Sequence, residues 1–330
     1  MLKRYCVFLS FLILCCVCIS GCNTRTISQT SMVGGYTVTD VQGTVVHMKE
    51  KPKRILTLSM ETDEIMLGLV PPDRLVGVNM LLDDPLESTV VPQAKQISTK
   101  ITDPSVETIL ALKPDLVIVA DWGNLEKADM LRDMGISVVV CKGARTISDI
   151  RQNVMLLAEA IGEEDKGKSI VEQMNHTLDD IQKKVTRIPA EQQKSVVLIS
   201  LMNNYGGIGS AFDDACKYAH VINGMARAGI HDGQPMSKEM LVKINPDYLF
   251  LPSYTNHGRY DPDVFIREYV QDPALQSLTA VREGHLVKPR ESYIYNDSQD
   301  VVFGVQEIAY AVYGEPFAQP NGCHISAVDT

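Results

Sequence analysis

Short apolar runs alternate with segments of helical periodicity along most of this chain. Runs that are typical of buried strands lie at 54–59, 75–78, 116–118, 136–140, 196–201, 248–250 and 285–287. Apolar residues spaced by three and four predict helices at 60–69, 125–134, 212–226, 262–269 and 300–313. A hairpin is expected at 36–47, because polar and apolar residues alternate there around Gly43. Strands that alternate with helices of about ten residues indicate parallel β-α-β units and an α/β fold.

The middle of the chain differs from both halves. From 148 to 188 the pattern is helical almost without interruption, weakened only at Gly162 and Gly167 and ended at Pro189. The run is too short for a coiled coil and ends in proline, so a long helix that joins two lobes is the better interpretation. The chain past Pro316 is expected to be poorly ordered.

One phrase of the sequence occurs twice, at 105–118 and again at 237–250. In both copies a serine stands two residues before a glutamate, Glu107 or Glu239, and Pro-Asp follows that glutamate at an offset of seven. The serine can cap a helix, the glutamate gains from the helix dipole, and Pro-Asp stops the helix before an apolar strand. Two copies predict two similarly built lobes, each with a carboxylate at a helix start.

The N-terminus has the features of an export signal. Lys3 and Arg4 precede an apolar stretch at 7–19, and small residues lead to Cys22. A membrane-spanning anchor, the alternative, needs about 20 apolar residues. The sequence Ile19-Ser20-Gly21-Cys22 resembles the lipobox of bacterial lipoproteins. This resemblance implies that Cys22 is lipidated and that the protein is extracytoplasmic and anchored to the cell membrane.

These observations divide the chain into six expected segments. They are a signal peptide at 1–21, a lipidated tether at 22–35, an N-terminal lobe at 36–147, a helical connector at 148–188, a C-terminal lobe at 189–318 and a tail at 319–330.

Composition, charge and the missing motifs exclude several classes of function. With 330 residues, 45% hydrophobic and 22% charged, the chain can form two cores of ordinary size. The net charge is −10 and no lysine or arginine block stands out, so nucleic acid is not an expected partner. The seven histidines are scattered without a His-x-x-x-His pair, and nucleophile motifs are missing. We therefore expect neither a metal bound by the protein itself, nor a cofactor, nor an enzyme.

Three cysteines, Cys141, Cys216 and Cys323, remain beyond Cys22. Their odd number and wide spacing do not indicate a disulfide framework or a Cys-x-x-Cys metal site. A single bridge between two of them and buried free thiols are both compatible with the sequence.

Several segments together resemble a known family. The matching pieces are 52–59 with Glu64 after it, 75–78, both copies of the repeated phrase, 135–139, 157–162 and 278–285. They resemble the substrate-binding lipoproteins of ABC importers, in the class that serves iron-siderophores, haem, ferric chelates and cobalamin. The resemblance covers about 36 to 314, and the order and spacing of the pieces are more specific than any one piece.

The resemblance implies a fold, a function and partners. The fold would be two Rossmann-like α/β lobes with parallel sheets, joined by a single long α-helix, with the ligand cleft between the lobes. The protein would be a monomer that captures a ferric siderophore or similar iron-chelate and delivers it to a permease dimer and, through it, an ATPase. Glu107 and Glu239 would dock onto permease arginines; either glutamate alone is better explained by its helix dipole, but the matched pair favours docking. A haem- or cobalamin-binding protein is the alternative, and a cell-surface enzyme or an adhesion lipoprotein is less favoured.

Candidate ligand residues lie in the loops after strands, where ligands of α/β sheets bind. They are Met60, Met80, Lys100, Trp122, Met202, Tyr205, Tyr254, Arg259, Arg290, Tyr293 and Tyr295. Trp122, the single tryptophan, suits a flat or aromatic ligand surface. Met60, Met202, Tyr205 or His257 could serve haem as an axial donor. The three cationic candidates would suit an anionic chelate, and the glycine-rich loop 206–210 could receive an anionic group.

Overall fold

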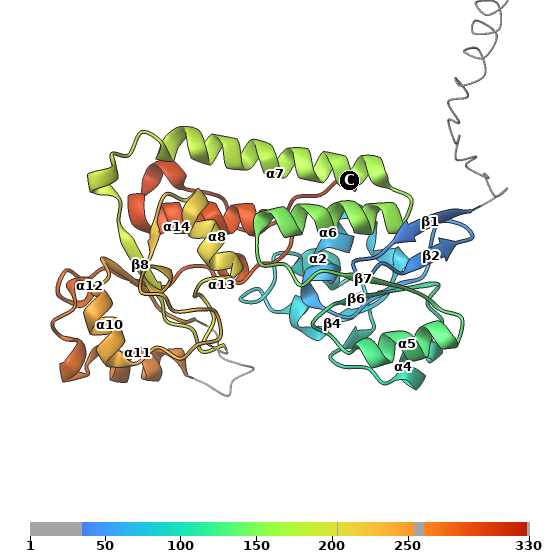
Figure 1. The fold of residues 1–330 in the computed structure, drawn as a ribbon, viewed down its shortest axis with the longest axis horizontal. Helices are drawn as coiled ribbons and strands as arrows, with labels where there is room; N and C mark the ends of the chain where they lie inside the picture. The colour runs from blue at the N-terminus through green and yellow to red at the C-terminus, as the bar shows by residue number, and fades with distance from the viewer. Residues whose placement is uncertain (1–34, 203, 254–260, 329–330) are drawn as a thin grey trace, which may run out of the picture. The chain divides into compact units, whose positions relative to one another are not determined.

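Two parallel sheets, one in each half of the chain, form the framework (Figure 1). The computed structural model describes residues 35–202, 204–253 and 261–328, and the unit discussed below begins at Tyr36. Within this part of the chain, the first sheet has the order β5-β4-β3-β6-β7 and the second has the order β11-β10-β8-β9. The strands are β1 (Tyr36–Thr39), β2 (Val45–Met48), β3 (Ile55–Thr57), β4 (Leu75–Asn79), β5 (Lys100–Ile101), β6 (Leu116–Ala120), β7 (Ser137–Cys141), β8 (Ser195–Leu198), β9 (Ile222–Asn223), β10 (Tyr248–Phe250) and β11 (Leu286–Val287).

Helices cover both faces of each sheet. The longer ones are α2 (Met60–Leu69), α4 (Val106–Leu112), α5 (Leu125–Asp133), α6 (Ile147–Ala160), α7 (Glu164–Val185), α8 (Ala211–Tyr218), α10 (Lys238–Ile244), α11 (Pro262–Val270) and α14 (Val301–Tyr313). Single turns complete the set: α3 (Val91–Ala94), α9 (Gly224–Arg227), α12 (Thr279–Arg282), α13 (Glu291–Ile294), and the 3₁₀ segments η1 (Pro72–Arg74), η2 (Met80–Asp83), η3 (Ala190–Gln192), η4 (Pro273–Leu275) and η5 (Glu315–Phe317). None of the helices in the described part of the chain combines the length and the apolar character that crossing a membrane requires.

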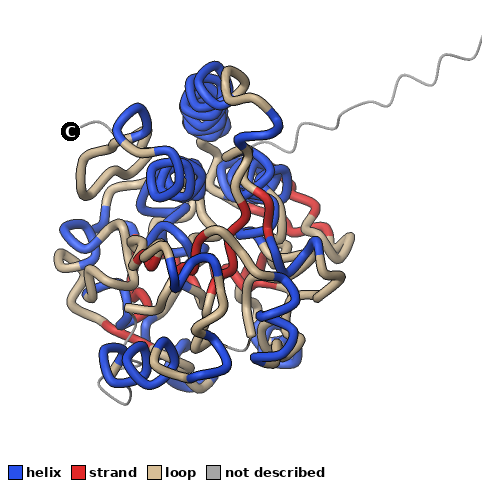
Figure 2. Tube along the Cα trace, turned by 90° about the vertical axis from the view of Figure 1, so that its left-hand side faces the viewer, coloured by secondary structure: helices blue, strands red, loops and turns tan. Residues whose placement is uncertain are grey.

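The apolar strands are buried on both faces, as their continuous hydrophobic runs predict. In β6, Leu116 and Ile118 pack into a core with α2 and α6, whereas Val117 and Val119 pack into a second core with α4 and α5. Figure 1 shows these helix pairs on opposite sides of the first sheet, and Figure 2 shows the strands between helical layers. The second sheet is built in the same way, with α8 and α14 on one face and α9, α10 and α12 on the other. The expected fold of two α/β lobes with parallel sheets is therefore confirmed.

The connector is two helices rather than one, which corrects the prediction for 148–188. The chain leaves α6 at Ile161, turns at Gly162 with φ of +67°, and begins α7 at Glu164. A residue with a side chain is strained at that φ, so Gly162 supplies the turn. Helix α6 packs against α7 and the first lobe, and at its start the backbone N–H of Ile147 donates to Asp214 of α8 at 2.9 Å. Helix α7 continues across to pack on α8 and α14. The long helix that spans the two lobes is thus α7.

The helix predicted at 212–226 is also interrupted. Helix α8 ends at Tyr218, His220 adopts a left-handed φ of +57°, and the short strand β9 follows. The Asn223 side chain then accepts hydrogen bonds from the backbone of Met225 and Ala226 and starts α9. This cap breaks the predicted helix into two helices and an edge strand.

The repeated phrase folds as predicted, and its aspartates have a further role. Ser105 and Ser237 each cap their helix by accepting a hydrogen bond at 3.2 Å from the backbone three residues on. Asp115 accepts hydrogen bonds from the backbone N–H groups of Lys53 and Arg54 just before β3. Asp247 accepts one at 2.7 Å from the first N–H of β8. The Pro-Asp pair therefore ends one helix and also fixes the start of the neighbouring central strand in each lobe.

The chain after Pro316 is not poorly ordered, and that expectation is wrong for the described residues through Val328. Phe317 and Ile325 are buried, and the backbone N–H of Ala327 donates to the carbonyl of Gly68 in α2 at 2.8 Å. The tail keeps its place because it buries apolar side chains and pairs its backbone with a helix. Cys141, Cys216 and Cys323 are free thiols.

Candidate functional site

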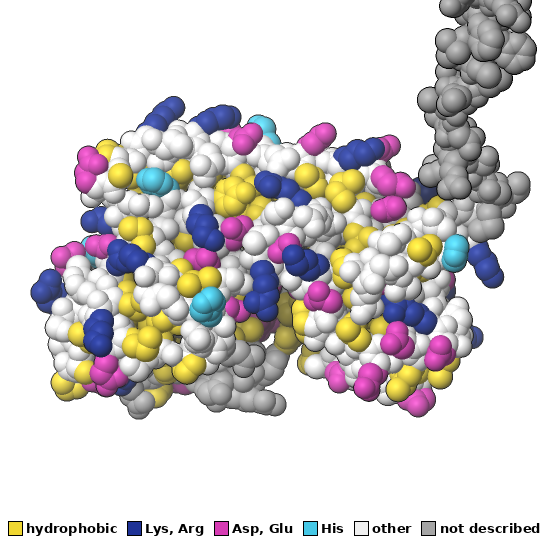
Figure 3. Space-filling view, viewed as in Figure 1, with side chains coloured by type: hydrophobic (Ala, Val, Ile, Leu, Met, Phe, Trp, Pro, Cys, Tyr) yellow, Lys and Arg dark blue, Asp and Glu magenta, His cyan; other side chains and the backbone are white. Residues whose placement is uncertain are grey.

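A cleft opens between the two lobes, at the carboxyl ends of their strands. It consists of two adjoining cavities of about 560 Å³ and 480 Å³. Both cavities are lined by Glu61, Trp122, Met202, Tyr295 and Asp297. Figure 3 shows the surface hollowed between the lobes on the side away from α7. Its position agrees with the general rule for ligand sites in parallel α/β sheets.

Trp122 forms the aromatic wall on the first lobe. It follows β6 and remains 65% exposed, although it lies in a concave site. The backbone N–H of Gly143, which follows β7, donates to the Asp121 carboxylate at 2.8 Å and joins the two loops. A Cβ atom on Gly143 would lie 2.5 Å from Trp122 Cδ1, closer than such atoms pack. The glycine therefore provides the space that the indole occupies.

Two tyrosines form the opposing wall on the second lobe. The Tyr205 and Tyr295 rings are 5.0 Å apart between centroids and tilted by 40°. The Tyr205 hydroxyl accepts a hydrogen bond from the backbone N–H of Phe212 at 3.1 Å, which fixes the ring against the start of α8. Burial raises the pKa of both hydroxyls, so both rings are neutral at physiological pH. Met202 adds a 39% exposed thioether beside them.

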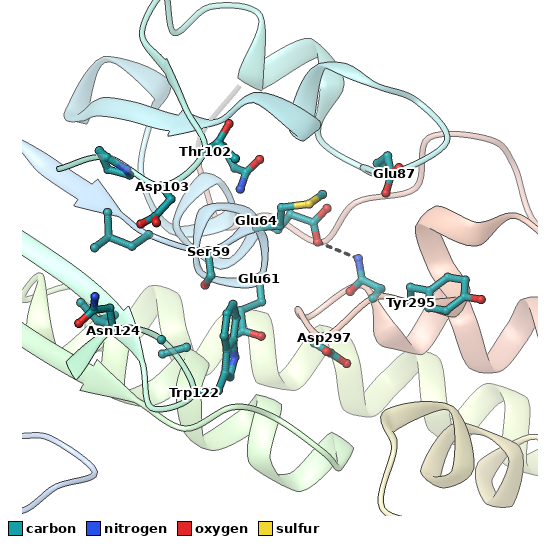
Figure 4. A pocket seen from close by; sticks show the side chains of 18 of the residues that line it. Ser59, Glu61, Glu64, Glu87, Thr102, Asp103, Trp122, Asn124, Tyr295 and Asp297 are labelled. Atoms are coloured by element: carbon teal, nitrogen blue, oxygen red, sulfur yellow. Dashed lines mark hydrogen bonds between the residues drawn. The ribbon is translucent and has the colours of Figure 1, made fainter. Parts of the chain in front are cut away.

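Two carboxylates face the cleft from opposite lobes. Glu61 lies in the first turn of α2 and Asp297 precedes α14, and in Figure 4 both lie in the cavity beside Trp122. Burial, with a contribution from the Asp297 charge, raises the pKa of Glu61 to about 8, against the opposing effect of a hydrogen bond with Trp122. Burial and the charges of Glu64 and Asp232 raise the pKa of Asp297 to about 7.

A buried polar network behind these carboxylates joins the lobes and the tail. Asn296 donates to Glu64 of α2 at 2.7 Å, the contact that is dashed in Figure 4. Thr89 of the first lobe donates to Asp300 at 2.6 Å, and His324 Nδ1 of the tail lies 2.8 Å from the same carboxylate oxygen. Burial and the Asp300 charge raise the pKa of Glu64 to about 7. The network fixes the loop that carries Asp297.

Five of the candidate ligand residues come together in the cleft and four do not. Those in the cleft are Met60, Trp122, Met202, Tyr205 and Tyr295. Met80, Lys100, Arg290 and Tyr293 line neither of its cavities. Tyr254, His257 and Arg259 lie outside the described residues, as do Cys22 and the predicted signal peptide.

The two described cationic candidates are already paired elsewhere. The Lys100 ammonium donates to Asp83 at 2.7 Å and to the carbonyl of Ala94 at 2.8 Å. The Arg290 guanidinium donates twice to Glu307, at 2.8 and 2.5 Å, and lies over the Tyr293 ring. The expectation that these two residues face an anionic ligand is therefore wrong for this structure.

The glycine-rich loop 206–210 borders the second cavity but has acidic neighbours. Asp232 accepts a hydrogen bond from the backbone N–H of Gly206 at 3.1 Å, and Ser210 caps α8 by accepting one from Asp213 at 3.1 Å. These internal hydrogen bonds take up donors that an anionic ligand group would need.

Sequence reasoning missed the acidic character of the cleft. Glu61, Asp121, Asp232 and Asp297 are not among the residues that the sequence singled out as ligand candidates. The signal for Glu61 was its position directly after a buried strand. Asp297 gave no comparable signal, because the segment before it is a short helix rather than a strand. Among the described residues, no group of three or more His, Cys, Asp or Glu side chains is arranged to hold a metal ion.

Glu107 and Glu239 are fully exposed at the starts of α4 and α10. In Figure 1 these helices lie in different lobes, on the side away from α7. Hydrogen bonds from its own backbone and from Ser105 lower the pKa of Glu107, and bonds from Ser237 and its own backbone lower the pKa of Glu239. Both side chains are therefore ionised at neutral pH and free to meet a partner.

Two doubly wound lobes bridged by α7, with an aromatic cleft between them, define a two-lobed ligand-binding protein. The chain belongs to the periplasmic binding protein family, whose model matches residues 55–293. It is 26% identical over 320 residues to the uncharacterized ABC transporter substrate-binding lipoprotein YvrC of Bacillus subtilis, covering 93% of this chain and 97% of that protein. It is 24% identical to the Fe(3+)-citrate-binding protein YfmC of the same species, covering 84% and 87%.

Solved structures share the fold. The apo form of the periplasmic heme-binding protein RhuT from Roseiflexus sp. RS-1 matches with a TM-score of 0.68 at 21% identity, covering 79% of this chain and 98% of that one. The molybdate-binding protein MolA of Haemophilus influenzae matches with a TM-score of 0.70 at 19% identity, covering 86% and 92%. The family assignment suggested by the sequence is thereby confirmed.

Proposed function

We propose that this protein is the substrate-binding lipoprotein of an ABC importer and captures a ferric siderophore or a similar iron-chelate. The observation that carries the proposal is the cleft between the lobes, where Trp122 on one side faces Tyr295 and Tyr205 on the other. Flat aromatic and thioether surfaces suit a rigid chelate with apolar faces. Relatives named for Fe(3+)-citrate and siderophore binding support this ligand class.

Delivery to a permease is the second part of the proposal. Glu107 and Glu239 are ionised, exposed and held at matched positions in the two lobes. Two such carboxylates can form bidentate pairs with arginines of a two-fold symmetric partner. The matched geometry favours docking over the helix dipole alone, because the dipole would not require the glutamate in both copies.

Attachment to the membrane through Cys22 completes the proposal. It rests on the lipobox-like sequence before Cys22 and on the names of relatives that are lipoproteins. The protein would act as a monomer, because each lobe supplies a single docking carboxylate.

Fluorescence of Trp122 tests the ligand class directly, since it is the only tryptophan in the chain. The purified full-length chain, kept in detergent, is titrated with ferric trihydroxamates, ferric tricatecholates, ferric citrate, haem and cyanocobalamin. We expect saturable quenching in the nanomolar to low micromolar range by one class of iron-chelate, with iron-free chelators as the control for absorption. Saturation by haem or cyanocobalamin alone would favour the alternative cargo, and quenching by none of them would refute the ligand proposal.

A pair of variants tests the cleft itself. Tyr295→Ala should weaken binding by about tenfold, because it removes an aromatic wall of the cavity. Tyr310→Ala is the matched control, since Tyr310 is a partly exposed tyrosine of α14 that lines neither cavity of the cleft. Equal affinities of the two variants, measured by calorimetry, would show that the ligand binds elsewhere.

A further inference from the structure

The charged side chains of the cleft are predominantly acidic. Among the described residues that line its two cavities, the cationic ones are Lys127 and Arg145. The Lys127 ammonium is occupied by Asp103 at 2.5 Å and by the carbonyl of Pro104 at 2.7 Å. Arg145 is exposed at the rim and makes a long contact of 3.5 Å with the carbonyl of Gly209. An anionic ligand would therefore meet little positive charge on this part of the wall.

Glu61 and Asp297 each have one carboxylate oxygen without a hydrogen-bond partner among the described residues, although Glu61 also has a hydrogen bond with Trp122. The Oε1 atom of Glu61 and the Oδ1 atom of Asp297 are both buried, and neither has a hydrogen-bond partner among the described residues. By contrast, Glu64 accepts from Asn296, and Asp121 accepts from Gly143. A buried carboxylate oxygen without a partner is costly, so a site that holds two of them favours a donor from outside the chain.

The helix dipole does not account for this arrangement. The dipole of α2 stabilises the ionised form of a glutamate in its first turn and by itself would lower the pKa of Glu61. Burial nevertheless raises the pKa of Glu61 to about 8, so the surroundings disfavour its charge more than the dipole favours it. Asp297 lies in the loop before α14 rather than in a helix, and burial raises its pKa to about 7 although the charge of Arg145 acts in the opposite direction. The two groups come from different lobes, and both line the cavity beside Trp122 (Figure 4).

We propose that Glu61 and Asp297 receive a positively charged group of the cargo, so that the cleft selects cationic chelates over neutral and anionic ones. This inference rests on the proposed function and names the charge class of its ligand. A protonated amine on the chelator would donate hydrogen bonds to the unpartnered oxygens of both carboxylates, and a chelate with net positive charge would offset their negative charge. The aromatic walls would hold the rest of the chelate, as the proposed function requires.

A matched series of ligands tests the charge class without changing the metal centre. The ferric complex of desferrioxamine B carries a free ammonium group, its N-acetyl derivative is neutral at that end, and its N-succinyl derivative is anionic. Aquocobalamin and cyanocobalamin form a second pair that differs by one positive charge. In whichever of the two series shows binding, the cationic ligand should bind about tenfold more tightly than the neutral ligand. In the desferrioxamine series, the anionic derivative should bind more weakly than the neutral one.

Variants assign the preference to the two carboxylates. Glu61→Gln and Asp297→Asn should each reduce the preference for the cationic ligand, and the double variant should remove it. Glu172→Gln, an exposed glutamate on α7, is the control that should keep it. Thermal unfolding of each variant separates loss of binding from loss of fold.

The binding of a cation should also release protons near neutral pH. Glu61 is faced by Asp297 from the second lobe, by Asp121 and Trp122 from the loop after β6, and by Glu64 of its own helix. Asp297 is faced by Glu64, Asp232 and Arg145. A cationic ligand favours the charged carboxylates, so affinity should rise as pH increases from about 6 to about 8. Calorimetry in buffers of different ionisation enthalpy measures the released protons.

The outcomes separate this inference from the proposed function. Equal or tighter binding of the anionic and neutral members, or a cationic preference that survives the double variant, would overturn the charge assignment while the protein remains a chelate-binding protein. If no member of either series binds, and none of the wider panel of chelates binds, the proposed function fails and this inference fails with it.

Discussion

Replacing Glu61 with Gln should make the folded protein less sensitive to alkaline pH. The side chain keeps its size and its hydrogen-bonding reach but loses the charge that the cleft disfavours. In the wild-type protein, burial and the Asp297 charge raise the pKa of Glu61 to about 8, well above its value in an unfolded chain. A group with a raised pKa stabilises the fold fully below its unfolded pKa, and that contribution is lost as pH rises towards the folded pKa.

The size of the effect follows from one proton. Between about pH 5 and pH 8 the folded state holds a proton on Glu61 that the unfolded state has released, so wild-type stability falls by up to about 1.4 kcal/mol per pH unit from this group. Over two pH units the free energy of unfolding of Glu61→Gln should gain roughly 2–3 kcal/mol relative to wild type. Coupling to Asp297 broadens the titration and lowers the slope, but it does not change the sign.

Urea unfolding at several values between about pH 5 and pH 8 measures this difference. Asp63, Glu64, Glu87 and Asp297 also have raised pKa values and contribute to the slope in both proteins, so the informative quantity is wild type minus variant. Glu172→Gln, which changes an exposed carboxylate, should run parallel to wild type. Parallel curves for Glu61→Gln as well would refute the view that the cleft disfavours this charge, and with it the basis for a cationic ligand.

Three further changes have distinct expected outcomes. Replacing both Glu107 and Glu239 with Ala should leave ligand affinity and stability unchanged, because both side chains are exposed. The double variant should abolish uptake of the labelled chelate in cells, and undiminished uptake would refute the docking role. Gly143→Ala should displace the Trp122 indole, because the new Cβ would lie 2.5 Å from its ring. The displacement should shift the fluorescence emission of Trp122 and weaken ligand binding, with little change in melting temperature. An unchanged emission spectrum would contradict this packing. Asp247→Ala should cost about 1–3 kcal/mol of unfolding free energy in urea titrations, because the first N–H of β8 loses its acceptor. Asp129→Ala, which removes only an exposed ion pair with Arg132, should cost less, and equal losses would count against the strand-start role.

The sequence pattern predicted the order of strands and helices well because those signals are local. Apolar runs that are buried on both faces, together with the two serine caps, belong to segments of ten to fifteen residues and do not depend on distant partners. The connector shows the limit: apolar spacing continues through Gly162, and only the turn at that residue separates α6 from α7.

The cleft was predicted less completely, because its charges are set by long-range pairing. Arg290 is held by Glu307, and Lys100 by Asp83, pairs that no periodicity in the sequence reveals. Trp122 was recognisable because it follows a buried strand. One oxygen of Glu61 has no partner among the described residues because of the residues that surround it from both lobes. These neighbours are far apart in the sequence and come together only in the folded chain.

The cleft opens on the same side of the molecule as α4 and α10, the helices in whose first turns Glu107 and Glu239 lie (Figures 1 and 3), and this position would set the route of cargo if a permease docks there. Pro104 lines the larger cavity and lies two residues before α4, so the cleft wall runs directly into the surface that carries Glu107. On the opposite side, α7 and the network around Asp300 join the lobes and close the back of the cleft. A permease bound at the two glutamates would therefore lie across the mouth of the cleft. Cargo that leaves the cleft would then meet the permease at this mouth.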